Sequence, residues 1–151
     1  MLIYLSFDEK DNASGTRLKT ILTPLEHQYG IRVWSKQDIR AGDVWQQEMA
    51  SHLSLSSLFV AIVSSDYLAS DRCQSELSAA AELQRRCQLD IAIVLSRACE
   101  WRYLPFAVKC VLPSNGKSIS SWSRNDQAWL NVHKGIADLI LAAYKRLDGK
   151  Q

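Results

Sequence analysis

The sequence predicts one α/β domain in which helices cover both faces of a parallel sheet. Short, almost uninterrupted apolar runs recur along the chain, as expected of parallel strands that are buried on both faces. Segments with helical periodicity separate these runs, and such an alternation favours right-handed crossovers between neighbouring strands. The length of 151 residues suits one compact core.

Five runs are predicted to be strands, and they cover residues 2–5, 31–34, 58–63, 91–95 and 108–112. The longest of these, LFVAIV, is far shorter than the roughly 20 apolar residues of a membrane-spanning helix. The start, MLIYLSF, has no basic segment and turns acidic at Asp8, so it fits a first strand better than a signal peptide. We therefore expect a cytoplasmic protein without a membrane partner.

Apolar residues at helical spacing predict the inward faces of four helices. These residues are Leu18, Ile21, Leu22 and Leu25; Trp45, Met49 and Leu53; Cys73, Leu77, Ala80 and Ala81; and Trp129, Val132, Ile136, Leu139, Ile140, Ala143 and Leu147. Ser14 is the expected N-cap of the first helix and Asp43 that of the second, after a turn at Gly42. Gly149 is expected to end the last helix, so we place one domain at residues 1–148.

Composition argues against several functions. Eighteen basic and sixteen acidic residues are interspersed, which leaves no basic stripe for nucleic acid. The four cysteines lie too far apart for a CxxC motif, and the three histidines are isolated from one another. We expect no metal, no bound cofactor and no direct contact with nucleic acid.

The stretch SDRCQSELSAAAEL, residues 70–83, places a carboxylate on an inward helix face. Glu76 follows Cys73 by three residues and precedes Ala80 by four, so it falls inside the apolar stripe. Burying an acid requires either partners or a raised pKa. Ligands of such sheets bind beyond the carboxyl ends of the strands, where this helix begins. Glu76 is therefore a candidate for catalysis, and the alternative is a structural ion pair with Arg72 or Arg86.

Several segments resemble the Toll/interleukin-1 receptor (TIR) domain family in its bacterial form. These segments are IYLSFDEKD, VWSKQDIRAGDVW, LFVAIVSSDYLASDRCQSEL, IAIVLSRACEWRYLPF and SSWSRNDQAWLNVHKGI, in the order that the family has. The resemblance implies a flavodoxin-like three-layer fold, in which a five-stranded parallel sheet of order 2-1-3-4-5 has helices on both faces. It also implies that the domain is part of a longer, multidomain protein.

The resemblance extends to the branch of the family that cleaves NAD⁺ between nicotinamide and ribose. The residues CQSE match the motif that ends in the catalytic glutamate, which is Glu76 here. Family enzymes often have tryptophan four residues earlier, where this chain has Arg72. The resemblance implies that NAD⁺ is a substrate and not a cofactor. The implied substrate-binding residues are Ser6, Phe7, Asp8, Asp38, Ile39, Gly42, Trp45 and Arg72.

One carboxylate suits this reaction. The nicotinamide of NAD⁺ leaves as a neutral molecule, so its departure needs no general acid. The ribose becomes cationic as the bond breaks, and a fixed carboxylate beside it stabilises that charge. The resemblance implies products of nicotinamide and either ADP-ribose or a cyclic isomer of it. It also implies assembly with other TIR domains, as a homo-oligomer or filament, in antiphage (antiviral) defence signalling.

Two alternatives have other functions. The first is a TIR scaffold that signals through contacts between domains and does not hydrolyse NAD⁺. The second is a phosphoacceptor receiver domain, which has the same strand order and an acidic cluster that Asp8, Glu9 and Asp66 imitate. A receiver also needs a lysine just after its fifth strand, where this chain has Pro113.

Overall fold

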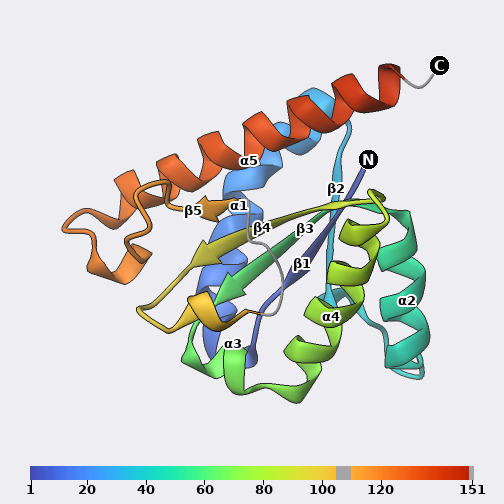
Figure 1. Ribbon diagram of the computed structural model, residues 1–151, viewed down its shortest axis with the longest axis horizontal. Helices are drawn as coiled ribbons and strands as arrows, with labels where there is room; N and C mark the ends of the chain where they lie inside the picture. The colour runs from blue at the N-terminus through green and yellow to red at the C-terminus, as the bar shows by residue number, and fades with distance from the viewer. Residues whose placement is uncertain (105–109, 150–151) are drawn as a thin grey trace.

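The computed structural model describes residues 1–104 and 110–149. Five strands pair in parallel in the order β2-β1-β3-β4-β5, which confirms the predicted fold and sheet order (Figure 1). The strands are β1 (Leu2–Ser6), β2 (Arg32–Ser35), β3 (Ser56–Val63), β4 (Asp90–Leu95) and β5 (Val111–Leu112). Positions 108 and 109 of the predicted fifth strand lie outside the described residues.

Helices form a layer on each side of the sheet (Figure 1). One layer contains α1 (Asn12–Tyr29) and α5 (Asn125–Asp148). The other contains α2 (Trp45–Leu55), α3 (Ser65–Ala69) and α4 (Asp71–Arg85). Short 3₁₀ turns lie in the described connections: η1 (Glu9–Asp11), η2 (Lys36–Asp38), η3 (Trp101–Tyr103) and η4 (Ile119–Ser121).

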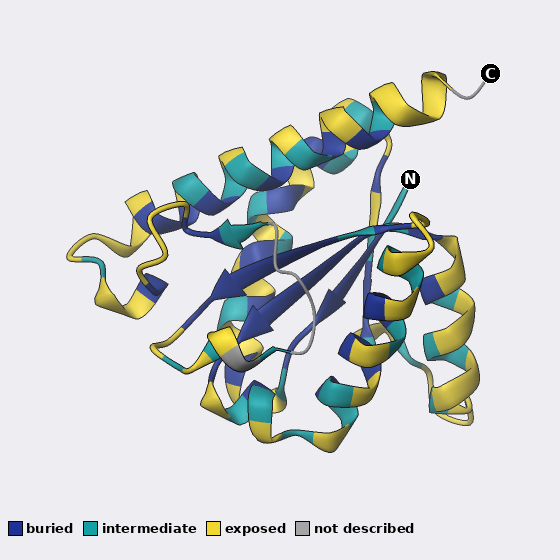
Figure 2. Ribbon diagram, viewed as in Figure 1, coloured by how far each residue is buried: buried dark blue, intermediate teal, exposed yellow. Residues whose placement is uncertain are grey.

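The sheet separates two hydrophobic cores. Figure 2 shows that the central strands are buried and that the helices are exposed mainly on their outer sides. Successive residues of a strand point to opposite faces. Ile3 and Leu5 of β1 therefore pack with α1 and α5, whereas Tyr4 between them packs with Phe59 and the helices of the other layer. Burial on both faces explains why the strands have uninterrupted apolar runs.

Both predicted N-caps are wrong. Ser14 lies inside α1, because the helix already begins at Asn12 with Asp11 as its N-cap. The N-cap of α2 is Val44, and the carboxylate of Asp43 instead accepts a hydrogen bond from the backbone N–H of Arg40 at 2.9 Å. Ser14 thus lies too far along its helix to cap it, and Asp43 bonds a backbone N–H that precedes its helix.

The structure bears out two predicted backbone features and adds an element. Gly42 has φ +92°, which a side chain would disfavour, and Gly149 ends α5. The short helix α3 was not predicted; the Ser64 hydroxyl caps it by accepting from the N–H of Tyr67. In the part of the chain that the structure describes, no helix combines the length and apolarity that crossing a membrane requires.

Candidate active site

The candidate catalytic acid, Glu76, lies near the start of α4, on the side of the helix that faces the sheet. The hydroxyl of Ser70 caps this helix by accepting a hydrogen bond from the N–H of Cys73 at 3.2 Å. From this start, the helical period turns Cys73, Glu76, Leu77 and Ala80 towards the sheet, and all four are buried. The prediction that Glu76 lies on an inward face is confirmed, because its exposed fraction is 0%.

Both carboxylate oxygens of Glu76 have a hydrogen-bond donor. The hydroxyl of Tyr4, from the middle of β1, donates to Oε2. The guanidinium of Arg72, one turn earlier on α4, donates to Oε1 and forms an ion pair with the carboxylate. The ring of Tyr4 is fixed in turn between Trp34 and Phe59, with centroid distances of 5.0 and 5.3 Å. The acid is thus held rigidly by two elements of the fold.

Arg72 has a second partner. Its other terminal nitrogen donates to the backbone carbonyl oxygen of Phe7, at the exit of β1, at 2.7 Å. The guanidinium therefore bridges the acid of α4 and the chain beyond β1. The side chain of Arg72 is 18% exposed, in contrast to the complete burial of Glu76.

A pocket of about 210 Å³ opens beside this bridge. Its lining residues come from the exits of β1 and β2 and from the starts of α1 and α4: Phe7, Glu9, Asn12, Lys36, Gln37 and Arg72. This position, at the carboxyl ends of adjacent strands, is where ligands of such sheets bind. Arg72 reaches the pocket and Glu76 does not line it, so the guanidinium separates the acid from the space that a ligand would enter.

Burial raises the pKa of Glu76 above that of an ordinary glutamate. The hydrogen bond from Tyr4 and the positive charge of Arg72 offset part of this increase, because both favour the ionised carboxylate. Burial and the neighbouring carboxylate also raise the pKa of the Tyr4 phenol, which stays protonated as a donor. The groups that lower the pKa of Glu76 come from three elements: Tyr4 and Ser6 of β1, Lys36 of η2 and Arg72 of α4. Tyr67 of α3 and Cys73 of α4 also face the acid, and its charge contributes to the raised pKa of each.

This raised pKa predicts a pH-dependent stability. Between the ordinary glutamate pKa of 4.5 and the raised value, the folded protein binds more protons at Glu76 than the unfolded chain does. The free energy of unfolding should therefore fall as pH rises through this window, by at most about 1.4 kcal/mol per pH unit. Urea unfolding at a series of pH values, with Glu76→Gln for comparison, measures this slope. The variant should lack it, and equal slopes in both proteins would contradict the prediction.

The structure brings some of the predicted substrate-binding residues to the pocket. Phe7 and Arg72 line it. The Ser6 hydroxyl does not line it and is 2.9 Å from the Tyr67 hydroxyl, and both side chains are buried. The carboxylate of Asp8 caps η1 by accepting from the N–H of Lys10 at 3.0 Å. These residues thus form or support the β1 side of the pocket.

The four predicted residues of the loop after β2 lie elsewhere. Asp38 lines a separate hollow of about 700 Å³ beside β2 and α2. Ile39 packs against the core under α2 and α4, and Gly42 is exposed. Trp45 is half-buried, and its indole nitrogen is buried without a hydrogen-bond partner among residues 1–104 and 110–149. A role for these four residues in substrate binding remains a prediction.

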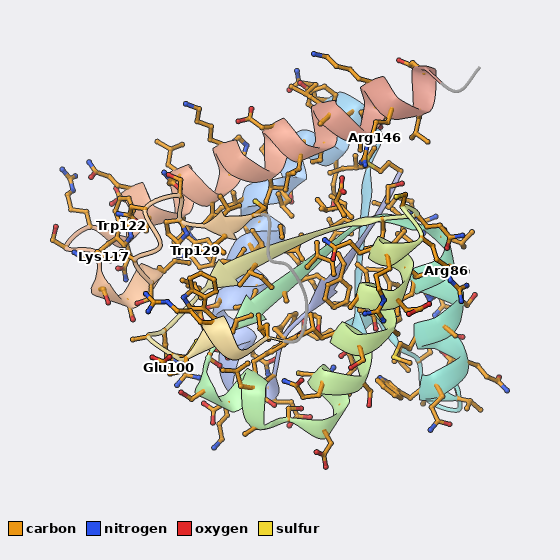
Figure 3. The ribbon with its side chains drawn as sticks, viewed as in Figure 1. Arg86, Glu100, Lys117, Trp122, Trp129 and Arg146 are labelled. Carbon is orange, nitrogen blue, oxygen red and sulfur yellow. The ribbon has the colours of Figure 1, made fainter. Side chains whose placement is uncertain are left out.

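Sequence reasoning missed Tyr4, Lys36, Asn12 and Gln37. One signal could have identified Tyr4: a tyrosine inside the apolar run LIYLS is buried, and a buried hydroxyl needs a hydrogen-bond partner. Arg86, the other cation weighed as a partner of Glu76, instead pairs with Glu82 at 3.3 Å. Figure 3 shows Arg86 at the edge of the molecule.

The acidic residues that suggested a receiver domain form a different arrangement. Asp66 pairs with Arg97 at 2.6 Å and with Lys10 at 3.5 Å, and the hydrogen bond from Arg97 is the main cause that lowers the pKa of its carboxyl. The buried Asp11, which the sequence analysis did not single out, accepts hydrogen bonds from the hydroxyls of Ser64 and Ser96. These contacts tie the ends of β3 and β4 to the start of α1.

The sheet order, the two helix layers and the pocket at the strand exits define a flavodoxin-like α/β domain. The family model for the TIR domain matches residues 3–112, and the chain belongs to this family. The chain is 28% identical over 137 residues to the uncharacterized protein y4lF of Sinorhizobium fredii. This match covers 90% of the chain and 42% of y4lF, so the chain spans less than half of that relative.

Two solved structures share the fold. The crystal structure of the TIR domain of the Toll-related receptor TRR-2 from Hydra magnipapillata superposes with a TM-score of 0.50. Its sequence is 16% identical, and the match covers 72% of this chain and 83% of that one. The TIR domains in the activated Roq1 resistosome, which directly recognizes the pathogen effector XopQ, give a TM-score of 0.51 at 21% identity. That match covers 62% of this chain and 55% of the other.

Proposed function

We propose that this TIR domain is an NAD⁺ glycohydrolase with Glu76 as its catalytic residue. The observation that supports this most strongly is a completely buried carboxylate, held by Tyr4 and Arg72, at the edge of the sheet where ligands bind. A buried acid whose pKa is raised by burial, and which lies beside a pocket, is a candidate for a functional site. NAD⁺ is the substrate, and the reaction uses no further cofactor.

The reaction breaks the bond between ribose C1′ and the ring nitrogen of nicotinamide. The electron pair of this bond goes to the nitrogen, so nicotinamide leaves as a neutral molecule and positive charge develops on the ribose. The carboxylate of Glu76 stabilises this charge electrostatically. A water oxygen then bonds to C1′ and releases a proton, which gives ADP-ribose. An adenine nitrogen that attacks C1′ in place of water gives a cyclic isomer.

The pocket beside Glu76 provides surfaces that could bind the substrate. Phe7 offers apolar surface, and the side-chain amide of Asn12 keeps two N–H donors for ribose hydroxyls while its oxygen accepts from the amide of Gln37 at 3.4 Å. The loop that contains Asp38, Ile39, Gly42 and Trp45 would close over the pocket and contact neighbouring TIR domains when the protein assembles into a homo-oligomer or filament. Such assembly would activate the enzyme in cytoplasmic antiphage defence signalling.

A TIR scaffold without catalysis is the second candidate, and one observation favours it. Both oxygens of Glu76 are engaged, and Arg72 stands between this acid and the pocket. In this arrangement the carboxylate is neutralised and unavailable to a substrate. A domain that used Glu76 only as a structural ion pair would have the same contacts.

Product analysis distinguishes the two candidates. The purified domain, at low and at high concentration, is incubated with NAD⁺, and nicotinamide, ADP-ribose and cyclic isomers are separated by chromatography over time. We expect nicotinamide release that rises more than proportionally with protein concentration, because assembly completes the site. No release at any concentration, including conditions that drive the domain into oligomers, would support the scaffold.

A further inference from the structure

The bridge formed by Arg72 is poorly matched to the reaction proposed for this site. The substrate carries a positive charge on its nicotinamide ring, and the ribose becomes cationic as the bond breaks. A guanidinium bound to the carboxylate cancels the negative charge that should stabilise both. Arg72 also occupies the boundary between Glu76 and the pocket. The acid can act only after Arg72 has moved.

The contacts of Arg72 indicate what would move it. Its guanidinium has five N–H donors in a planar fork, and the hydrogen bonds to Glu76 and to the Phe7 carbonyl use two of them. A phosphate group offers several oxygens in the geometry that such a fork binds best. Lys36 lines the same pocket with a side chain that is 40% exposed, and its ammonium pairs there with the carboxylate of Glu9 at 3.2 Å. An anion that displaced this exposed carboxylate would meet a second cation.

We propose that Arg72 is the specificity-determining residue of this site: it locks Glu76 in the resting state and transfers to the diphosphate of the dinucleotide when substrate binds. The proposal rests on the glycohydrolase function above. Its consequence is that a substrate releases the catalytic acid only if it carries phosphate. Nicotinamide riboside has the same glycosidic bond as NAD⁺ but no phosphate, so it would bind to a site whose acid is still paired.

A comparison of these two substrates tests whether the ion pair of Arg72 with Glu76 controls cleavage. The ratio of kcat/KM for NAD⁺ to that for nicotinamide riboside is measured in the wild type, in Arg72→Gln and in Lys36→Gln. Close charge pairs change an equilibrium constant by about tenfold or more. In Arg72→Gln we expect cleavage of nicotinamide riboside to increase by about tenfold, because Glu76 is free, while cleavage of NAD⁺ decreases. Lys36→Gln should weaken NAD⁺ cleavage more than nicotinamide riboside cleavage, because Lys36 lines the pocket and a phosphate is the group it would bind, whereas it forms no direct contact with Glu76.

Arg72→Gln is expected to change the cleavage of the two substrates in opposite directions, which no general loss of structure would do. A purely structural role of Arg72 would lower the cleavage of both substrates by the same factor, and that result would overturn the proposal. If Arg72→Gln melts at a much lower temperature than the wild type, Arg72→Lys replaces it. Lysine keeps the charge but cannot donate to both Glu76 and the Phe7 carbonyl through one planar fork, so the same directions are expected with smaller changes.

A binding experiment without turnover separates this proposal from the proposed function. When Arg72 leaves Glu76, the acid loses a positive neighbour and takes up a fraction of a proton. Calorimetric titration with ADP-ribose in buffers of different ionisation enthalpy measures this uptake, and adenosine serves as the probe without phosphate. We expect uptake with ADP-ribose in the wild type and none in Glu76→Gln or with adenosine. Proton uptake in a domain that releases no nicotinamide would support the proposed transfer of Arg72 and contradict the proposed glycohydrolase function. Absence of ADP-ribose binding, or binding without proton uptake, would overturn the proposed role of Arg72.

Discussion

Replacing Glu76 by glutamine is expected to lower the rate of nicotinamide release by about 10²–10⁴-fold, the range associated with loss of one catalytic group. The amide has nearly the same size as the carboxylate but no charge to stabilise the cationic ribose. Its oxygen can still accept a hydrogen bond from Tyr4. The loss should therefore appear mainly in kcat, with a smaller change in KM, because the interaction forms in the transition state. Steady-state measurement of nicotinamide release in both proteins checks this.

A matched control lies on the same helix. Glu82 is exposed and pairs with Arg85 and Arg86 on the surface, so Glu82→Gln should retain wild-type activity. Circular dichroism and thermal unfolding establish that both variants are folded. Activity of Glu76→Gln within tenfold of the wild type would remove this residue from the chemistry, and an equal loss in Glu82→Gln would attribute the effect to the helix as a whole.

The position of Glu76 was predictable from sequence because it depends on local geometry. The helical period fixes which face each residue of α4 occupies, and its spacing from Cys73 and Ala80 was sufficient. The same period identifies Arg72, one turn earlier, as a possible partner. By contrast, Tyr4 meets Glu76 across 72 positions of the chain. That contact requires the sheet order and the register of β1, which no local pattern specifies.

The loop after β2 shows where local reasoning fails. Gly42 was predicted correctly to form a turn, because its positive φ is a property of that residue alone. The cap expected from Asp43 failed for another reason: its carboxylate can accept either from an N–H of the helix start or from the N–H of Arg40. In the structure it accepts from Arg40. Whether Asp38 approaches the pocket depends on how the whole loop packs. In this structure it forms a capping box with Ser35 and borders another hollow.

The packing behind Tyr4 supports the site and predicts the largest change in stability. Phe59, in the middle of β3, has an exposed fraction of 0% and stacks on the ring of Tyr4 with an interplanar angle of 19°. Phe59→Ala removes most of this buried ring from a close-packed core. We expect the free energy of unfolding to fall by about 3–5 kcal/mol and the melting temperature by about 6–20 °C. Urea and thermal unfolding measure both quantities.

The comparison variant is Leu130→Ala, on α5, because Leu130 is 67% exposed and its truncation should change the free energy of unfolding by less than about 0.5 kcal/mol. Phe59→Ala should also affect the site, since a Tyr4 ring without its stacking partner holds its hydroxyl less firmly against Glu76. Nicotinamide release at a temperature where the variant is still folded should therefore decrease. A loss of stability below 1 kcal/mol would show that the core closes around the missing ring, and unchanged activity would show that Tyr4 keeps its place without Phe59.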